Sequence, residues 1–353
     1  MAAPAEVTLE VLPRTRLDVV DVNRQIAETF GDLLRSYAKA LYFSYHTTAG
    51  YLEQSLAARL SQGREGVEPF IQVFKAIFPA GADYRHDRLE EREELSEEQR
   101  REEPRNADSH LAYIGSGLRS CVTYSNRPDQ PVYFIDLDGV NGDHSRRRQT
   151  SVVGFTSERV AERVRLEIPV SAHPIDSINL RDPRIGLFEQ LHELVDRHGV
   201  AKGRIDIALA PGERQAGLTV NEFETLLMQH DLAEVLHDPF RFFAEKTRHA
   251  LADPRAIPTR TIEYAKYDLV RVLNSAIETM GMSESVVEKV IARLMAYPAN
   301  RFLRMKRSLS LLVSDRDGDH RIVQGTYQSP ILVQWDKCER QARQVDVTVT
   351  ELI

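Results

Sequence analysis

Residues 42–50 of this 353-residue chain read Tyr42-Phe43-Ser44-Tyr45-His46-Thr47-Thr48-Ala49-Gly50. Aromatic residues at the start of the stretch favour a β-strand, and the small residues at its end let a ligand come close to the backbone. A strand over Ala40 to Tyr45 would aim the imidazole of His46 from a rigid sheet edge into a cleft. We therefore expect the fold to be organised around this strand and its histidine.

Strand and helix patterns surround this stretch in the first half of the chain. Alternating residues predict a strand over Val7 to Leu12, and apolar residues at helical spacing predict a helix over Val22 to Leu41, capped by Asp21 or Asn23. The charged run Arg88 to Arg105 predicts a solvated loop or exposed helix. Further helices are expected over Gly50–Leu60 and Val67–Phe78. Further strands, of which the first two should pair, are expected over Leu118–Tyr124, Val132–Leu137 and Gln149–Phe155.

The same order of elements begins again near residue 164. It comprises a strand over Val164–Val170, a helix over Ile185–Val195, a strand over Arg204–Ala210, a helix over Thr219–Leu236 and four late strand-like segments between Ser308 and Leu352. This repeat predicts an internal duplication. We expect an α+β fold of two similar units, sandwich-like or barrel-like with flanking helices, in residues 1–160 and 161–353. A helical insertion over about 261–297 in the second unit should serve packing or an interface.

Two more histidines, His86 and His110, follow His46 in polar sequence. Three neutral imidazoles from separate segments suit zinc or a similar divalent ion, whose bound water would have a lowered pKa. Asp87 and Asp108 lie beside two of the histidines and are expected to accept hydrogen bonds from them. In a metal-free alternative, His46 and His110 act as general acid and base and Asp87 orients them. A purely structural, hydrogen-bonded histidine is the common alternative for each position.

An arginine run follows the polar loop Asp136 to His144. The loop has the composition of a calcium loop but lacks the glutamate that would close it, so we do not expect calcium. The forked guanidinium groups of Arg146, Arg147 and Arg148 suit a phosphate, to which Thr47 and Thr48 can also donate.

Five motifs in order carry a resemblance to a known family: His46-Thr47-Thr48-Ala49, Tyr84-Arg85-His86-Asp87, Asn106-Ala107-Asp108-Ser109-His110, Gly115-Ser116-Gly117 and Arg146-Arg147-Arg148. With them, residues 6–155 resemble the YjbQ family of secondary thiamine-phosphate synthase enzymes. The first half lacks the Asn-Glu pair and the Gly-Thr-Trp-Gln strand of that family. The second half keeps counterparts of both, Asn221-Glu222 and Gly325-Thr326-Tyr327-Gln328, but has Glu213 to Gly217 in place of the histidine box.

The resemblance implies a homo-oligomeric enzyme that joins a pyrimidine diphosphate to a thiazole phosphate. Because the two halves keep different parts of the motif set, we expect one composite site per chain, or per contact between chains, to which both halves contribute. The implied catalytic residues are His46, His86, His110, Asp87 and Glu222, and the three histidines are the implied zinc ligands. The implied substrate-binding residues are Thr47, Thr48, Asn106, Arg146, Arg147, Arg148, Asn221 and Gln328. Two alternatives stay open: a non-catalytic ligand-binding or assembly protein, and a metal-dependent hydrolase of phosphate esters.

Composition narrows the classes of partner. The net charge of −7 and a pI near 5.9 give no basic field for nucleic acid. The longest apolar runs are too short to span a bilayer, and the first residues lack the pattern of a secretory signal. Cys121 and Cys338 form no metal or redox spacing. We therefore expect a cytoplasmic protein whose partner is a small phosphorylated molecule, with no nucleic acid and no membrane.

Overall fold

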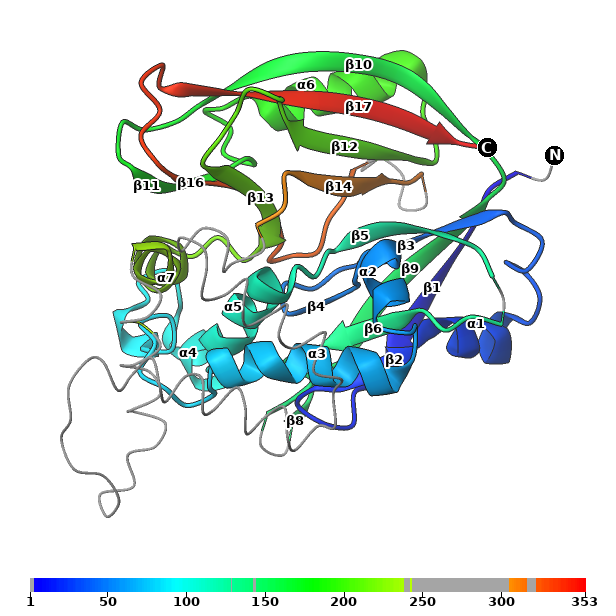
Figure 1. Cartoon of the computed structure of the whole chain (residues 1–353), viewed down its shortest axis with the longest axis horizontal. Coiled ribbons are helices and arrows are strands. Elements are labelled where there is room, and N and C mark those ends of the chain that lie inside the picture. The colour runs from blue at the N-terminus through cyan, green and yellow to red at the C-terminus, as the bar shows by residue number, and fades with distance from the viewer. Residues whose placement is uncertain (1–2, 128, 142–143, 238–241, 243–304, 316–321) are drawn as a thin grey trace. The chain divides into compact units, whose positions relative to one another are not determined.

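The computed structural model describes residues 3–127, 129–141, 144–237, 242, 305–315 and 322–353 (Figure 1). The predicted insertion at 261–297 lies outside them. The chain forms two compact units. The sheet unit consists of Met1–Arg64, Leu118–Phe223 and Lys306–Ile353, and the helical unit consists of Glu65–Gly117 and Glu224–Met305. The predicted division into residues 1–160 and 161–353 concerns sequence repeats and stays a prediction.

Two antiparallel sheets come from the first half of the chain within the sheet unit. The larger sheet has the order β1 (Ala5–Val11), β9 (Arg148–Phe155), β3 (Lys39–Ser44) and β5 (Cys121–Ser125). The smaller sheet has the order β2 (Asp18–Asp21), β6 (Tyr133–Asp136) and β4 (Ala49–Gly50). A two-stranded ribbon follows, of β7 (Val140–Asn141) and β8 (His144–Ser145). The predicted strand that leads to His46 is therefore an inner strand of the larger sheet.

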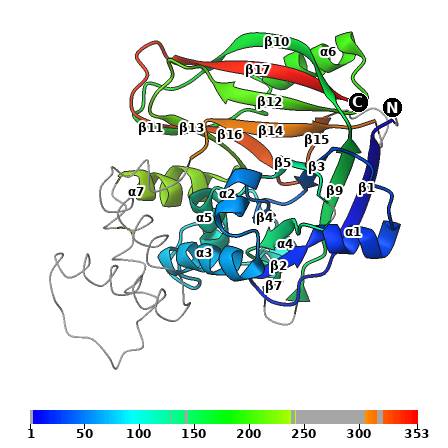
Figure 2. The ribbon, with the colours of Figure 1, turned by 45° about the vertical axis from the view of Figure 1, so that its right-hand side comes forward.

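The second half builds the same arrangement, and all its strands also belong to the sheet unit (Figure 2). Its larger sheet has the order β10 (Glu158–Pro169), β17 (Ala342–Leu352), β12 (Gly203–Leu209), β14 (Ser308–Val313) and β15 (Ile322–Val323). Its smaller sheet has the order β11 (Ile175–Asn179), β16 (Ser329–Trp335) and β13 (Ala216–Asn221). In both halves the first strand pairs with the last, and the last pairs with the strand after the first long helix. The repeated order of elements is confirmed, and a duplication as its origin stays a proposal.

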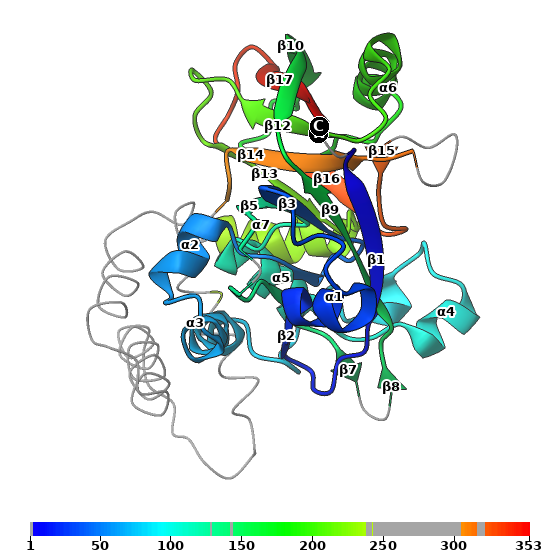
Figure 3. The same cartoon turned by 90° about the vertical axis from the view of Figure 1, so that its right-hand side faces the viewer.

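The larger sheets of the two halves bury apolar side chains against each other. Leu41 and Phe43 of β3 share one cluster with Leu312 of β14 and Leu352 of β17. The outer faces are covered by α1 (Val22–Phe30) in the first half and α6 (Leu187–His198) in the second, as Figure 3 shows. Alternation of side chains along each strand lets one sheet bury both faces. The α+β fold class expected from the sequence is confirmed.

The remaining helices are α2 (Gln54–Arg59) in the sheet unit and a set in the helical unit. That set comprises α3 (Arg64–Ile77), whose first residue still belongs to the sheet unit, the 3₁₀ turn η1 (Leu89–Glu91), α4 (Glu97–Glu102), α5 (Ala107–Ser116), the π-helical turn η2 (Leu226–Asp231) and α7 (Leu232–His237). None of the helices in the described part of the chain is long and apolar enough to cross a membrane.

Three expectations about the elements are wrong. The helix from Val22 ends at Phe30 because Gly31 takes a left-handed φ of 61°. The helix expected from Thr219 begins as strand β13, so Asn221 lies at a strand end. The strands β5 and β6 do not pair with each other, since β5 pairs with β3 and β6 lies between β2 and β4.

Candidate active-site clusters

The predicted site residues fall in both units, so each cluster is described within its own unit. His86, His110, Asp87 and Asn106 belong to the helical unit, and the other predicted site residues belong to the sheet unit.

His86 is fully buried in the helical unit, and both of its ring nitrogens face oxygen acceptors. Nδ1 lies 3.1 Å from Oε2 of Glu224, and Nε2 lies 3.2 Å from Oδ1 of Asn106. A ring with an acceptor on each side is best satisfied when both nitrogens carry a proton. The Glu224 carboxylate is the charge that stabilises such an imidazolium, so this pair is equipped to hold a proton.

The carboxylate of Glu224 is fixed by the start of η2. It accepts hydrogen bonds from the backbone N–H groups of Leu226 at 2.6 Å and Leu227 at 2.7 Å. Burial acts to raise the pKa of Glu224, but the hydrogen bonds from His86 and from these N–H groups outweigh it and hold the pKa below its ordinary value. Glu224 therefore stays ionised beside His86.

Two more carboxylates fix the backbone around His86. Asp231 accepts from the backbone N–H of Arg85 at 3.0 Å and of His86 at 2.9 Å. Asp87 accepts from the backbone N–H of Ala107 at 3.0 Å, and burial raises its pKa to about 6. Asp87 thus joins the His86 segment to the start of α5, and the structure shows no bond from it to a histidine ring among the contacts of the described residues.

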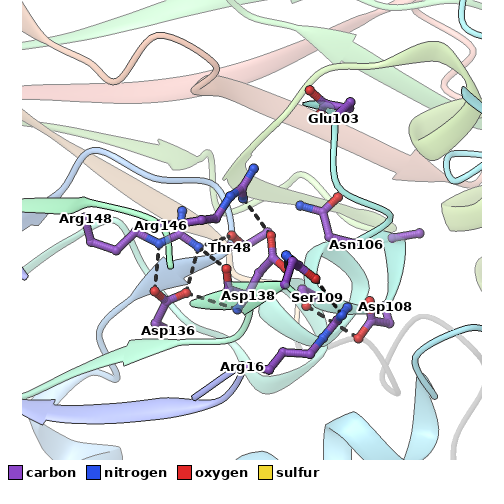
Figure 4. Close-up of polar contacts among 12 residues, drawn as sticks. Arg16, Thr48, Glu103, Asn106, Asp108, Ser109, Asp136, Asp138, Arg146 and Arg148 are labelled. Atoms are coloured by element: carbon purple, nitrogen blue, oxygen red, sulfur yellow. Dashed lines mark hydrogen bonds and ion pairs between the residues drawn. The ribbon is translucent and has the colours of Figure 1, made fainter. Parts of the chain in front are cut away.

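The helix α5 carries His110, whose ring centroid lies 5.1 Å from that of His86 with the planes at 75°. Every residue of α5 is buried. Its Asp108 forms an ion pair with Lys75 of α3, whose Nζ also donates to Oγ of Ser109 at 3.1 Å. Asn106, Asp108 and Ser109 are labelled together in Figure 4. Asp108 therefore forms an ion pair with Lys75.

In the sheet unit, His46 follows β3 and is partly buried. Its Nε2 accepts a hydrogen bond from the backbone N–H of Gln149 at 2.7 Å. Burial lowers the pKa of His46 to about 3, and the charges of Arg148 and Arg146 act in the same direction. The ring is therefore neutral, and its one proton lies on Nδ1.

Arg148 is buried, and its Nε and Nη2 donate within the protein (Figure 4). Nε and Nη2 reach the two oxygens of Asp136 at 2.7 and 2.8 Å, and Nη2 also reaches the carbonyl of Asp138 at 2.8 Å and Oγ1 of Thr48 at 3.3 Å. A phosphate at Nε or Nη2 of Arg148 would have to displace one of these partners.

The other two arginines of the run are more accessible. Arg146 is one-third exposed and pairs with the buried Asp138 at 2.6 Å. Arg147 is 82% exposed, with only a 3.7 Å approach of Nε to Glu10. Of the three predicted phosphate ligands, these two keep guanidinium surface that an anion can reach.

Second-half residues contact the backbone of the histidine box in the sheet unit. Nε2 of Gln328 donates to the carbonyls of Ser44 and His46, and Nδ2 of Asn221 donates to the carbonyl of Thr47 at 3.4 Å. The backbone N–H of Glu222 donates to Oδ1 of Asn221 at 2.8 Å. The predicted sharing of one site by the two halves thus has a contact basis for Gln328 and Asn221.

The position that corresponds to His46 in the second half is held by Glu213. Ala49 lies opposite Asp136 in the first small sheet, and Ala216 lies opposite Gln334 in the second, so the three residues before each alanine correspond. The buried carboxylate of Glu213 lies 3.2 Å from Nη1 of Arg343 and 2.7 Å from Nη2 of Arg340. The second half therefore has an ion-pair cluster where the first has a histidine.

The sequence interpretation missed Glu224, Asp231 and Lys75. Glu224 stands two residues after the Asn221-Glu222 pair that the resemblance singled out, and this proximity was the signal available for it. No signal pointed to Asp231, whose contacts are with backbone N–H groups 145 and 146 residues away in sequence.

The zinc site that the sequence suggests stays a prediction. Among the described residues, no group of three or more His, Cys, Asp or Glu side chains is placed to hold one. His86 would have to give up Glu224 or Asn106 to become a ligand. As placed here, both ring nitrogens of His86 face oxygens of the protein.

Comparison with protein-family models finds no match, and no curated protein matches. Among solved structures, a YbjQ-like protein of unknown function from Sulfolobus solfataricus P2 is 16% identical, with a TM-score of 0.30, over 55% of this chain and 99% of that chain. A hypothetical protein from Aeropyrum pernix K1 is 15% identical, with a TM-score of 0.28, over 53% and 97%. An uncharacterized protein of the YjbQ/UPF0047 family from Clostridium acetobutylicum is 14% identical, with a TM-score of 0.27, over 54% and 99%. The chain is thus similar to such proteins over about half its length, at a level that carries no argument about activity.

Proposed function

We propose that this chain is an enzyme that acts on a small phosphorylated molecule and uses His86 for proton transfer. The observation that supports the proposal is the burial of His86 between the Glu224 carboxylate and the Asn106 amide. A buried histidine backed by an ionised carboxylate is the arrangement that general acid–base catalysis needs.

In the proposed step, a substrate oxygen replaces Oδ1 of Asn106 at Nε2 of His86. The proton on Nε2 then passes to that oxygen, and Glu224 stabilises the ring while it is protonated. His110, with its ring beside that of His86, is the second histidine of the site. Arg146 and Arg147 are the proposed phosphate donors.

The resemblance to the YjbQ family supplies the proposed reaction. A pyrimidine diphosphate joins a thiazole phosphate by a new carbon–nitrogen bond, and diphosphate leaves. An acid that protonates the leaving diphosphate assists this reaction, and His86 is the residue proposed for that role. Zinc held by His46, His86 and His110 is the metal-assisted form of the proposal.

Two measurements on purified protein test the proposal. The first is formation of thiamine phosphate from the two phosphorylated precursors by the parent, by His86→Gln and by the control His173→Gln. His173 is exposed, and Nδ1 of its ring lies 2.8 Å from the carbonyl oxygen of Ile175. We expect His86→Gln to lower turnover about 100-fold or more and the control to match the parent. The second is metal analysis, in which stoichiometric zinc that is lost in His46→Ala/His110→Ala supports the metal-assisted form.

A folded His86→Gln variant with parental turnover contradicts the proposal. Hydrolysis of a phosphate monoester without coupling of the precursors favours the hydrolase alternative. An assembly or binding role gains support from Glu213, because the second half has no histidine at the position of His46. A parent that binds the precursors but turns over none of them, nor the monoester, favours that role.

A further inference from the structure

The side-chain amide of Gln328 is committed entirely to the protein. Oε1 accepts from the backbone N–H of Gly325 at 2.9 Å, and Nε2 donates to the carbonyls of Ser44 at 2.8 Å and His46 at 2.9 Å. Gln328 is 1% exposed. Both hydrogens of Nε2 are therefore used, and none remains for the substrate-binding role that the resemblance implies.

The backbone beside Gln328 touches the backbone beside His46. A Cβ built on Gly325 would lie 1.8 Å from the carbonyl oxygen of Tyr45, which no side chain allows. The turn from Gly325 to Gln328 is closed by a hydrogen bond from Gln328 N to Gly325 O at 3.1 Å. The glycine is therefore required for close contact between the turn and the strand end, and this contact brings the Gln328 amide to its two acceptors.

These contacts hold His46 from the backbone side, while Gln149 holds it from the ring side. The Gln328 amide fixes the carbonyls of Ser44 and His46 itself, and Asn221 adds a longer bond to the carbonyl of Thr47. The imidazole in turn accepts from Gln149 through Nε2. Movement of the His46 backbone would break the bond to Gln149, because the two restraints act on one residue.

We infer that Gln328 is a positioning residue. It fixes the backbone of His46 so that the ring keeps Nε2 on the N–H of Gln149 and presents Nδ1–H. A side chain of the second half thus holds the histidine box of the first half by donating to its backbone carbonyls. The expected effect of Gln328 on turnover rests on the proposed function, whereas its expected effect on the tautomer of the His46 ring does not.

Gln334 provides a matched control. It is also fully buried, and its Nε2 donates to two carbonyls, those of Ser171 at 3.1 Å and His173 at 2.6 Å. Its Oε1 accepts from Arg343. Gln334→Met therefore removes a comparable set of bonds from the second half and leaves His46 untouched.

The test compares Gln328→Met, Gln334→Met and the parent by long-range ¹H–¹⁵N NMR, with the His46 signal assigned by its loss in His46→Gln. We expect a single Nδ1–H tautomer of His46 in the parent and in Gln334→Met. In Gln328→Met we expect a mixture of tautomers and an upfield shift of the Gln149 amide proton. Turnover of the precursors should fall about tenfold or more in Gln328→Met only.

A folded Gln328→Met variant with the parental tautomer of His46 overturns the inference. If that variant does not fold, Gln328→Glu serves in its place, because it keeps an oxygen acceptor for the N–H of Gly325 but removes the donors to the carbonyls of Ser44 and His46. The same change in the His46 signal is then expected, and its absence overturns the inference equally. The NMR comparison needs no substrate, so a parent without turnover refutes the proposed function and leaves this test decisive.

Discussion

Glu213 accepts in the second half the hydrogen bond that His46 accepts in the first. Oε1 of Glu213 receives the backbone N–H of Gln344 at 2.9 Å, and Nε2 of His46 receives that of Gln149 at 2.7 Å. Each donor follows a buried arginine, Arg343 or Arg148. The carboxylate of Glu213 and the imidazole of His46 therefore play the same local role. Each accepts the hydrogen bond of one backbone N–H group near the start of a strand.

The change of residue type is matched by a second change. In the first half, Nε of Arg148 bonds the carboxylate of Asp136, whereas in the second half Nε of Arg343 bonds the amide oxygen of Gln334 at 3.1 Å. Each buried arginine is thus paired with one buried carboxylate. Asp136 pairs with Arg148, whereas Glu213, at the position of His46, pairs with Arg343. The charge balance is kept although the histidine is lost.

The first prediction concerns this balance. Glu213→Gln removes the carboxylate that pairs with Arg343, whose side chain is only 4% exposed. The buried guanidinium group is then left beside neutral partners. We expect a loss of about 3–5 kcal/mol in the free energy of unfolding. Adding Gln334→Asp restores a carboxylate at the position of Asp136, so the double variant should recover about half of that loss. Urea unfolding of both singles and the double measures the coupling.

The control for this cycle is Glu167→Gln, since the exposed Glu167 accepts from the side chain of the same Gln344 at 3.3 Å. Its effect should stay within about 0.5 kcal/mol. Additive losses in Glu213→Gln/Gln334→Asp would show that the two positions do not share one charge balance.

The second prediction concerns the close approach at Gly325. Gly325→Ala places a methyl group against the carbonyl of Tyr45, where backbone has to move on one side. We expect a loss of about 2–3 kcal/mol or more, measured by urea unfolding. Gly212→Ala is the control because a Cβ there meets nothing within 4 Å, and its effect should stay below about 0.5 kcal/mol. Equal stability of the two variants would mean that the turn from Gly325 to Gln328 can move away from Tyr45 without a loss of stability.

The fold was readable from the sequence where periodicity was strong. The strands around Val7, Ile205 and Val349 alternate clearly, and the aromatic run at Tyr42 also favours a strand. The repeated order of these strands predicted the α+β architecture. The pairing of β5 and β6 could not be predicted correctly from the sequence. Two strands joined by a turn-rich segment predict a hairpin, although β5 pairs with β3 and β6 lies between β2 and β4. The helix expected from Thr219 failed for a related reason: Leu218 and Val220 fit a buried strand and a helix equally well.

The candidate site was readable only where its residues stand in local motifs. His86, Asp87, Asn106 and His110 share the helical unit as members of two short motifs. Glu224 is 138 residues from His86, so its contact depends on tertiary structure that no local pattern carries. The arginine run predicted a phosphate site, and that interpretation did not anticipate that Arg148 is buried and paired with Asp136, only 12 residues away.

The third prediction concerns acid stability. The carboxylate of Glu53 lies 2.6 Å from Arg119 and 3.1 Å from Lys306. Burial acts to raise its pKa, but the two cations outweigh it and hold the pKa below the ordinary value of 4.5. The stability that ionised Glu53 contributes is therefore present above pH 4.5 and is lost as the pH falls through the lowered pKa.

We expect Glu53→Gln to be less stable than the parent by about 1 kcal/mol or less at pH 7, since the side chain is partly exposed. The difference should shrink toward zero as the pH is lowered below 4.5. Urea unfolding at several pH values between 3 and 7 measures it. A difference that does not depend on pH would show that Glu53 acts through packing and not through its charge.

The last prediction concerns the charge beside His86. Glu224→Gln can keep its one amide oxygen for Nδ1 of His86 and the N–H of Leu227, but it removes the negative charge and the second oxygen, which accepts from the N–H of Leu226. Because a neutral amide stabilises an imidazolium poorly, turnover of the precursors should fall about 100-fold or more while the helical unit stays folded. The control is Glu162→Gln, whose carboxylate pairs with His198 at 2.6 Å on the surface and should not affect turnover. Parental turnover in a folded Glu224→Gln variant would leave His86 without its partner in catalysis, and the pair would then be structural.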